Sequence, residues 1–329
     1  MLKYLLKRLG MAVVVLIGVS LIIYFLTRLM PGDFVANKLA GISQSAGGAT
    51  PKEVEDLLYE QYGLGDNSFA GILTGYIKWL GNMLRLDMGH SFTHQDAVNS
   101  VIADHMGTSF IVALVATIFE FMIAIPLGIT AATHQYSIRD YVVTILVMVG
   151  ISLPSFYFGN MLKNWFAVQL DIFPTSGLET GGLTGFALLL DIAHHLVLPI
   201  LTVVILSIGG RMRMTRANML EVLSSDYIRT ARAKGLSETK VIYKHAFRNT
   251  LIPIVTTLAG LLPSLFSGAI ITEQVFGLPG IGNMALQAMQ QGDVPFIMGY
   301  NMFLALLSVI GVLLADLMYA LVDPRVKLK

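Results

Sequence analysis

Long apolar stretches alternate with polar segments along most of the chain. The run from Leu9 to Leu29 would be about 31 Å long as an α-helix, enough to cross the hydrocarbon core of a membrane. A shorter apolar stretch contains Pro199, so its alternative is a re-entrant or strongly bent segment. The pattern predicts an all-α polytopic membrane protein with six transmembrane helices, near residues 9–29, 107–133, 141–166, 194–210, 250–272 and 299–322.

These stretches divide the chain into four parts. Residues 1–29 form a short tail and the first span, and residues 30–106 form a polar domain outside the membrane. Residues 107–322 hold the other five spans and include a polar loop at 211–250. Residues 323–329 are a second tail.

Two helices are predicted in the segment 30–106. Thr50 and Pro51 precede an amphipathic pattern from Lys52 to Gln61. A second pattern, from Tyr76 to Leu86, places Trp79 and Met83 on one side, where they would lie at the lipid interface.

The positions of lysine and arginine predict the orientation. Sixteen of the 22 lie in the N-terminal tail, the 134–140 loop, the 211–249 loop and the C-terminal tail. Because cytoplasmic segments carry an excess of these residues, both termini are expected in the cytoplasm. The segments expected outside, including residues 30–106, are acidic.

Composition excludes several classes of protein. With 55% hydrophobic and 13% charged residues, the chain is too apolar for an ordinary soluble domain, and its net charge of +1 gives no electrostatic basis for binding nucleic acid. The chain has no cysteine, so disulfides and thiolate chemistry are ruled out. No phosphate-binding GxxxxGK[ST], HExxH or GxSxG pattern occurs, and His194 and His195 point to different helix faces, so neither an enzyme nor a metal site is expected.

The polar stretch from Leu223 to Pro253 is the most informative part of the chain. Two short helices are predicted, Tyr227 to Lys234 and Glu238 to Asn249, with Gly235 between them in a left-handed turn. The capping candidates are Ser225 or Asp226 for the first helix and Ser237 for the second. Such a basic amphipathic pair fits either a lipid surface or a socket on another protein.

The amino-acid sequence of this stretch favours a protein partner. RMTRANMLEVLSSDYIRTARAKGLS, from Arg213, followed by HAFRNTLIP, resembles the EAA-type loop of ABC importer inner-membrane permease subunits in the dipeptide and oligopeptide permease family. Arg229, Thr230 and Ala231 replace the Glu-Ala-Ala of the general pattern, a version typical of peptide permeases, and Phe247-Arg248 stands where the general pattern has Leu-Pro. The resemblance implies that the loop inserts into a separate cytoplasmic ATPase through Asp226, Tyr227, Arg229, Thr230, Ala231, Arg232, Lys234, Gly235 and Leu236.

A second match covers Ile271 to Gly299, ITEQVFGLPGIGNMALQAMQQGDVPFIMG. Its glycines and Pro279 prevent a continuous helix. The resemblance implies an external loop that dips towards the translocation path, and a plain surface loop is the alternative. The candidate residues for the path or its gate are Glu120, Pro154, Glu273, Phe276, Gly277, Pro279 and Gly280.

Ionisable groups within the spans are expected to face protein or water, because their burial in lipid is costly. Glu120 is the best candidate for a pore-facing or interhelical role, and structural pairing is favoured over substrate contact. Lys163 and Glu273 are near enough to the outer edge to snorkel. The glycines and alanines of 124–132 favour close helix packing.

The resemblance also implies the assembly. This subunit would pair with a second homologous permease, two ATP-binding subunits that hold ATP and Mg²⁺, and an extracytoplasmic peptide-binding protein, in a bacterial or archaeal inner membrane. No cofactor is expected in the chain itself. Glutathione or nickel are alternative cargoes, and an ion-coupled secondary transporter is a further alternative, disfavoured because no inverted repeat is visible.

Overall fold

The computed structural model describes residues 2–29, 69–94, 96–251, 257 and 260–322. Apart from one isolated bridge between His90 and Ala97, all regular structure in these residues is helical. The chain divides into two compact units, residues 1–107 with 284–310 and 329, and residues 108–283 with 311–328. This agrees with the expected all-α class.

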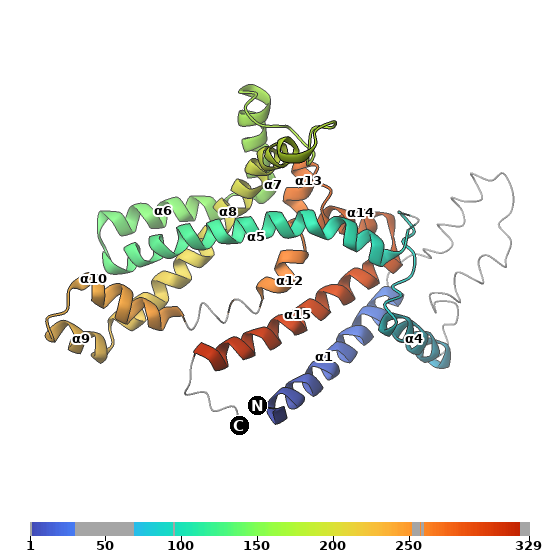
Figure 1. Ribbon diagram of the computed structural model, residues 1–329, viewed down its shortest axis with the longest axis horizontal. Helices are drawn as coiled ribbons and strands as arrows, with labels where there is room; N and C mark the ends of the chain where they lie inside the picture. The colour runs from blue at the N-terminus through green and yellow to red at the C-terminus, as the bar shows by residue number, and fades with distance from the viewer. Residues whose placement is uncertain (1, 30–68, 95, 252–256, 258–259, 323–329) are drawn as a thin grey trace. The chain divides into compact units, whose positions relative to one another are not determined.

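Figure 1 labels the helices along the chain, and the two marked η are π-helices. In chain order they are α1 (Leu2–Leu29), α4 (Phe69–Leu84), α5 (Val98–Thr133), α6 (Ile138–Ser152), α7 (Ser155–Leu162), η1 (Lys163–Gln169), α8 (Gly185–Leu223), α9 (Asp226–Ala233), α10 (Glu238–Lys240), η2 (Val241–Phe247), α12 (Leu261–Phe266), α13 (Ile270–Phe276), α14 (Ile281–Gln291) and α15 (Val294–Val322).

Four of the described helices are long and apolar enough to cross a membrane: α1, α5, α8 and α15. Two further segments pass the same test only as bent pairs. The chain turns by 99° between α6 and the helix from Ser155 to Gln169, and by 80° between the helices Leu261–Phe276 and Ile281–Gln291. When each bent pair counts as one span, the number rises to the six expected, but the second pair extends from Leu261 to Gln291 and so includes part of the loop expected after residue 272.

Two predicted spans differ in detail. The third is not continuous, because Leu153 precedes a proline and is held in an extended conformation, so a new helix begins after Pro154. The fourth is neither short nor re-entrant, since α8 continues through Pro199 to Leu223. Residues 211–223, expected in the polar loop, are the last turns of α8. Part of the fifth predicted span, residues 252–256 and 258–259, lies outside the described residues.

The first unit has an aromatic core. Tyr24 of α1 is fully buried against Tyr76, Trp79 and Met83 of α4. The hydroxyl groups of Ser20 and Tyr76 are 2.8 Å apart and hydrogen bonded. The prediction that Trp79 and Met83 lie at the lipid interface is therefore wrong, because the face that carries them packs inside the protein. The helix expected at Lys52 to Gln61 lies outside the described residues.

The second unit is built on close contacts of α8 with α5 and α6. In Figure 1, α5 and α6 run side by side and α8 crosses them obliquely. A Cβ placed on Gly128 of α5 would lie 2.7 Å from Cβ of Thr215 on α8, so only glycine permits this approach. Ala124 and Ala131 of α5 are completely buried. The predicted close packing through the small residues of 124–132 is confirmed.

Candidate functional site

A polar hairpin, defined here as Asp226–Phe247, connects α9 through a glycine turn to α10 and η2. Gly235 has φ +76°, the left-handed conformation that the sequence predicts, and its N–H donates to Arg232 O at 2.9 Å. Ser225 and Ser237 occupy the N-cap positions with extended backbones, as expected. Neither side chain caps its helix, and the hydroxyl of Ser225 donates instead to Val222 O at 2.6 Å.

One face of the hairpin is buried against its own chain. Ile228 and Ala231 of α9 pack with Met219 of α8 and with residues of α5 and η2. Ile228 is fully buried and Ala231 is 6% exposed. Ala231, one of the residues expected to contact the ATPase, thus lies with Ile228 on the face that anchors the hairpin. The complete cluster contains Ile129, Ala132, Met219, Ile228, Ala231, Val241 and Ala246.

The other face of the hairpin is open. Tyr227 is 47% exposed, and the side chains of Asp226 and Arg229 form a loose pair, 3.7 Å apart, at 97% and 75% exposure. Leu236 is half-buried at the edge of the anchoring cluster. The predicted contact residues that are exposed in this chain are Asp226, Tyr227, Arg229, Thr230, Arg232, Lys234 and Gly235.

An ion pair closes the hairpin across its turn. Arg232 donates from Nη2 to Oε1 of Glu238 at 2.6 Å and from Nε to Oε2 at 3.2 Å. The hydrogen bond from Arg232 holds the pKa of Glu238 below its usual value and raises the pKa of Arg232 in turn. This pair bridges the two helices on either side of Gly235.

The second group of predicted residues lies in the broken segment, residues 268–283, around the buried carboxylate of Glu273. Oε1 accepts hydrogen bonds from the Ser109 hydroxyl at 2.6 Å and the Ala269 N–H at 3.1 Å, and Oε2 accepts one from the Asn283 N–H at 2.9 Å. The Ser109 hydroxyl also accepts from the Ile281 N–H at 2.9 Å. The expectation that Glu273 snorkels is wrong: it is completely buried and satisfies backbone groups on both sides of the break.

The glycines of this segment make room for that carboxylate. A Cβ on Gly280 would overlap the Glu273 carboxyl group. Gly277 ends α13 with φ +62°, and Phe276 beside it is 2% exposed within the core. Pro279 is exposed. Five of the seven residues predicted for the path thus lie together, and their role in translocation stays a prediction.

A cavity of about 460 Å³ lies beside the broken segment. Three of its lining residues carry hydroxyl groups, Ser155 at the start of α7, Ser207 of α8 and Thr272 of α13. No charged side chain is among its described lining residues, and none of the seven predicted path residues is. The lining is Ser155, Val203, Leu206, Ser207, Gly268, Ala269, Ile270, Ile271 and Thr272.

Glu120 and Lys163 have partners within the chain. Arg211 of α8 donates from Nε to Oε1 of Glu120 at 2.9 Å, with its guanidinium carbon 4.8 Å from the centre of the Phe121 ring. Glu120 therefore takes the interhelical role that the sequence allowed. Lys163 does not snorkel, since its ammonium group donates to Val275 O at 2.9 Å.

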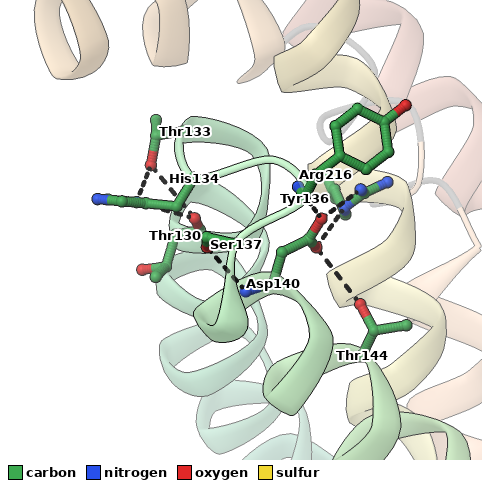
Figure 2. Close-up of polar contacts among 8 residues, drawn as sticks. All are labelled: Thr130, Thr133, His134, Tyr136, Ser137, Asp140, Thr144 and Arg216. Carbon is green, nitrogen blue, oxygen red and sulfur yellow. Dashed lines mark hydrogen bonds and ion pairs between the residues drawn. The ribbon is translucent and has the colours of Figure 1, made fainter.

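A second interhelical ion pair, between Asp140 of α6 and Arg216 of α8, was not predicted from the sequence. Figure 2 shows the two side chains facing each other with paired hydrogen bonds, 3.0 Å from Nε to Oδ1 and 2.8 Å from Nη2 to Oδ2. Asp140 is the only acidic residue between Glu120 and Asp171. Its isolation in the sequence was the signal that could have identified it as a paired residue.

The two adjacent histidines have separate hydrogen-bond partners. A ring nitrogen of His194 lies 2.9 Å from Ile172 O, and one of His195 lies 2.9 Å from Asp191 O. Within the described part of the chain, no three His, Asp or Glu side chains are grouped as metal ligands. The sites that remain are the hairpin, the broken segment and the cavity.

Comparisons with known proteins agree with these features. Residues 124–328 match the family described as "Binding-protein-dependent transport system inner membrane component". The chain is 37% identical to the oligopeptide transport system permease protein AppB of Bacillus subtilis, over 99% of this chain and 100% of the relative. It is 32% identical to the dipeptide transport system permease protein DppB of Escherichia coli K12, over the full length of both.

A solved structure shares the fold. It is an inward-facing conformation of the MetNI methionine ABC transporter, with a TM-score of 0.53 at 16% identity, covering 68% of this chain and 96% of that one. The family match, the full-length relatives and the membrane-spanning helices give one conclusion. This chain belongs to the family of inner-membrane components of binding-protein-dependent transport systems, and it is a multi-pass permease subunit.

Proposed function

We propose that this chain forms half of the translocation pathway of an ATP-driven importer of di- or oligopeptides. The full-length similarity to permeases named for oligopeptide and dipeptide transport supports the choice of cargo. The observation that carries the proposal is the polar hairpin, anchored by Ile228 and Ala231 on one face and open on the other. An isolated transporter has no need for such a surface, whereas a subunit driven by another protein does.

The open face of the hairpin docks into a separate cytoplasmic ATPase. Arg229 and Arg232 are paired with Asp226 and Glu238, and the exposed Lys234 next to Gly235 offers positive charge beside a stretch of backbone without a side chain. Two such ATPases bind ATP and Mg²⁺, and this chain catalyses no reaction. With the hairpin at the ATPase, both termini lie in the cytoplasm of a bacterial or archaeal cell.

The remaining partners complete the pathway. A second, homologous permease forms the other half, and an extracytoplasmic peptide-binding protein delivers cargo to the broken segment around Glu273. The cavity lined by Ser155, Ser207 and Thr272 offers neutral hydrogen-bonding groups to a passing peptide backbone. Lipid surrounds the apolar outer faces of the helices.

Reconstitution tests the proposal. The chain is purified with its copurifying subunits, placed in proteoliposomes with the binding protein outside, and supplied with a labelled tripeptide. Uptake should require ATP on the ATPase side and should persist when ionophores remove ion gradients. Uptake that continues with an inactive ATPase and stops when the ion gradient collapses would instead identify a secondary transporter.

Competition identifies the cargo in the same vesicles. Unlabelled di- and oligopeptides should reduce uptake, whereas Ni²⁺ and glutathione should leave it unchanged. Labelled nickel or glutathione transported at the rate expected of the peptide would show that the complex type is right and the peptide assignment wrong.

A further inference from the structure

The contact between Asp140 and Arg216 has more hydrogen bonds and is more buried than an ordinary surface ion pair. Both carboxylate oxygens take a hydrogen bond from the guanidinium, and each takes another from α6 or its preceding turn: Thr144 Oγ1 at 3.4 Å and Tyr136 N–H at 3.1 Å. The Asp140 side chain is 6% exposed and that of Arg216 is 27% exposed. Figure 2 shows all of these groups converging on one carboxylate.

The pair joins two elements at a defined place. Asp140 lies in the first turn of α6, where a negative charge is favourable next to the positive end of the helix dipole. Arg216 lies two turns before the end of α8. The paired hydrogen bonds fix the angle between these elements as well as their distance.

A second ion pair holds α8 from another side. Arg211 and Arg216 are five residues apart, which places them about 140° apart around the helix. Arg211 binds Glu120 of α5, while Arg216 binds Asp140 of α6. The C-terminal part of α8 is therefore tied to both neighbouring helices by directed contacts.

The polar hairpin rests on the same part of α8. Met219, three residues beyond Arg216, is fully buried against Ile228, Val241 and Ala246. A displacement of the hairpin must press on this end of α8 and on the adjoining residues Ile129 and Ala132 of α5. Whether the helices then move together depends on what ties them to each other.

We infer that the Asp140–Arg216 pair is a positioning contact that makes α6 and the end of α8 move as one body when the hairpin is displaced. Net stability is a poor explanation of such a pair, because the loss of hydration roughly cancels the attraction of buried charges, whereas fixed geometry remains. The inference rests on the proposed function, since it assigns the pair to the transmission of ATPase movement.

The first test measures peptide transported per ATP hydrolysed in the reconstituted complex. Arg216→Lys keeps the charge but loses the paired geometry. It should retain its ATPase subunits and hydrolyse ATP, yet transport about five- to tenfold less peptide per ATP. Arg216→Gln removes the charge as well and should also lower the amount of peptide transported per ATP. Its control is Arg213→Gln, at an exposed position on the same helix, which should match the wild type. Exchange of the pair, Asp140→Arg with Arg216→Asp, should restore part of the ratio.

A second measurement does not depend on transport. Because the chain has no cysteine, spin labels at Ile138→Cys on α6 and Glu221→Cys on α8, both exposed, report a single distance. The distance distribution should stay narrow with and without a non-hydrolysable ATP analogue in the wild type, and broaden in Arg216→Gln.

The outcomes separate the two proposals. Wild-type coupling in Arg216→Lys and Arg216→Gln, or an unchanged distance distribution, would overturn the positioning role while leaving the importer intact. Loss of folded protein in every variant, with no rescue by the exchanged pair, would reduce the contact to a structural one. A wild-type chain that binds no ATPase would overturn the proposed function, and the positioning role with it.

Discussion

The backbone N–H of Asn283 donates to Oε2 of Glu273 at 2.9 Å, across nine intervening residues that include a turn, a proline and three glycines. One side chain thus holds together the two helical pieces of the broken segment. With Ser109 and Ala269 on its other oxygen, it satisfies groups that would otherwise be buried without partners.

Replacing this acceptor should destabilise the segment. In Glu273→Gln, the amide nitrogen cannot accept, so at least one of the three donors loses its partner at a cost of about 1–3 kcal/mol. Thermal unfolding of the purified protein in detergent measures the change. Gln274→Ala, at the exposed neighbouring position, is the control. Equal melting temperatures for the two variants would argue against the role of Glu273.

The two faces of the hairpin should respond differently to mutation. Ile228→Ala removes a fully buried side chain from the anchoring cluster and should cost about 2–5 kcal/mol. Tyr227→Ala, at the exposed neighbour, should change stability by less than about 0.5 kcal/mol. Thermal unfolding separates the two, and recovery of the ATPase should fall in Tyr227→Ala without loss of folded permease. A stable Ile228→Ala protein would contradict the anchoring role.

A substitution at Gly235 should weaken binding of the ATPase more than it destabilises the chain itself. A Cβ at this position meets no atom within 4 Å, so Gly235→Asp costs only the strain of the left-handed backbone, about 1–2 kcal/mol. The variant should insert and fold, yet lose ATPase subunits on co-purification.

Gly182 supplies a matched control for that experiment. It has φ +90° and equally open surroundings, but lies outside the hairpin. Gly182→Asp should therefore carry similar strain and still recover the ATPase. Equal recovery by both variants would remove the basis for docking at the turn.

The Arg232–Glu238 pair gives a pH dependence with a defined sign. Because the pKa of Glu238 is lowered in the folded hairpin, its contribution is present above the unfolded pKa of about 4.3 and is lost as the pH falls through the folded value. Both side chains are about half exposed, so the effect should be about 0.5 kcal/mol or less. Hydrogen exchange of the hairpin amides below pH 5 should reveal this loss of stability, and Glu238→Gln should abolish the pH dependence.

Local features were predicted from the sequence more completely than distant ones. The hairpin and the break at Gly277–Gly282 follow from glycine, proline and polarity within a few residues. The environment of Glu273 could not be derived, because its partner Ser109 is 164 residues away. The end of α8 was misplaced at 210 for the same reason: Arg211 and Arg216 resemble loop residues until Glu120 and Asp140 are known to neutralise them.

The unbroken course of α8 relates the cavity and the hairpin by angle as well as by length. Ser207, at the cavity, and Met219, beneath the hairpin, are separated by about three turns and a further 120°. One inserted residue between them would rotate one site against the other by about 100° while lengthening the helix by only about 1.5 Å. The number of residues between Ser207 and Met219 therefore determines how the cavity and the hairpin are oriented around the helix axis. Insertions and deletions among homologous chains should fall outside this part of α8.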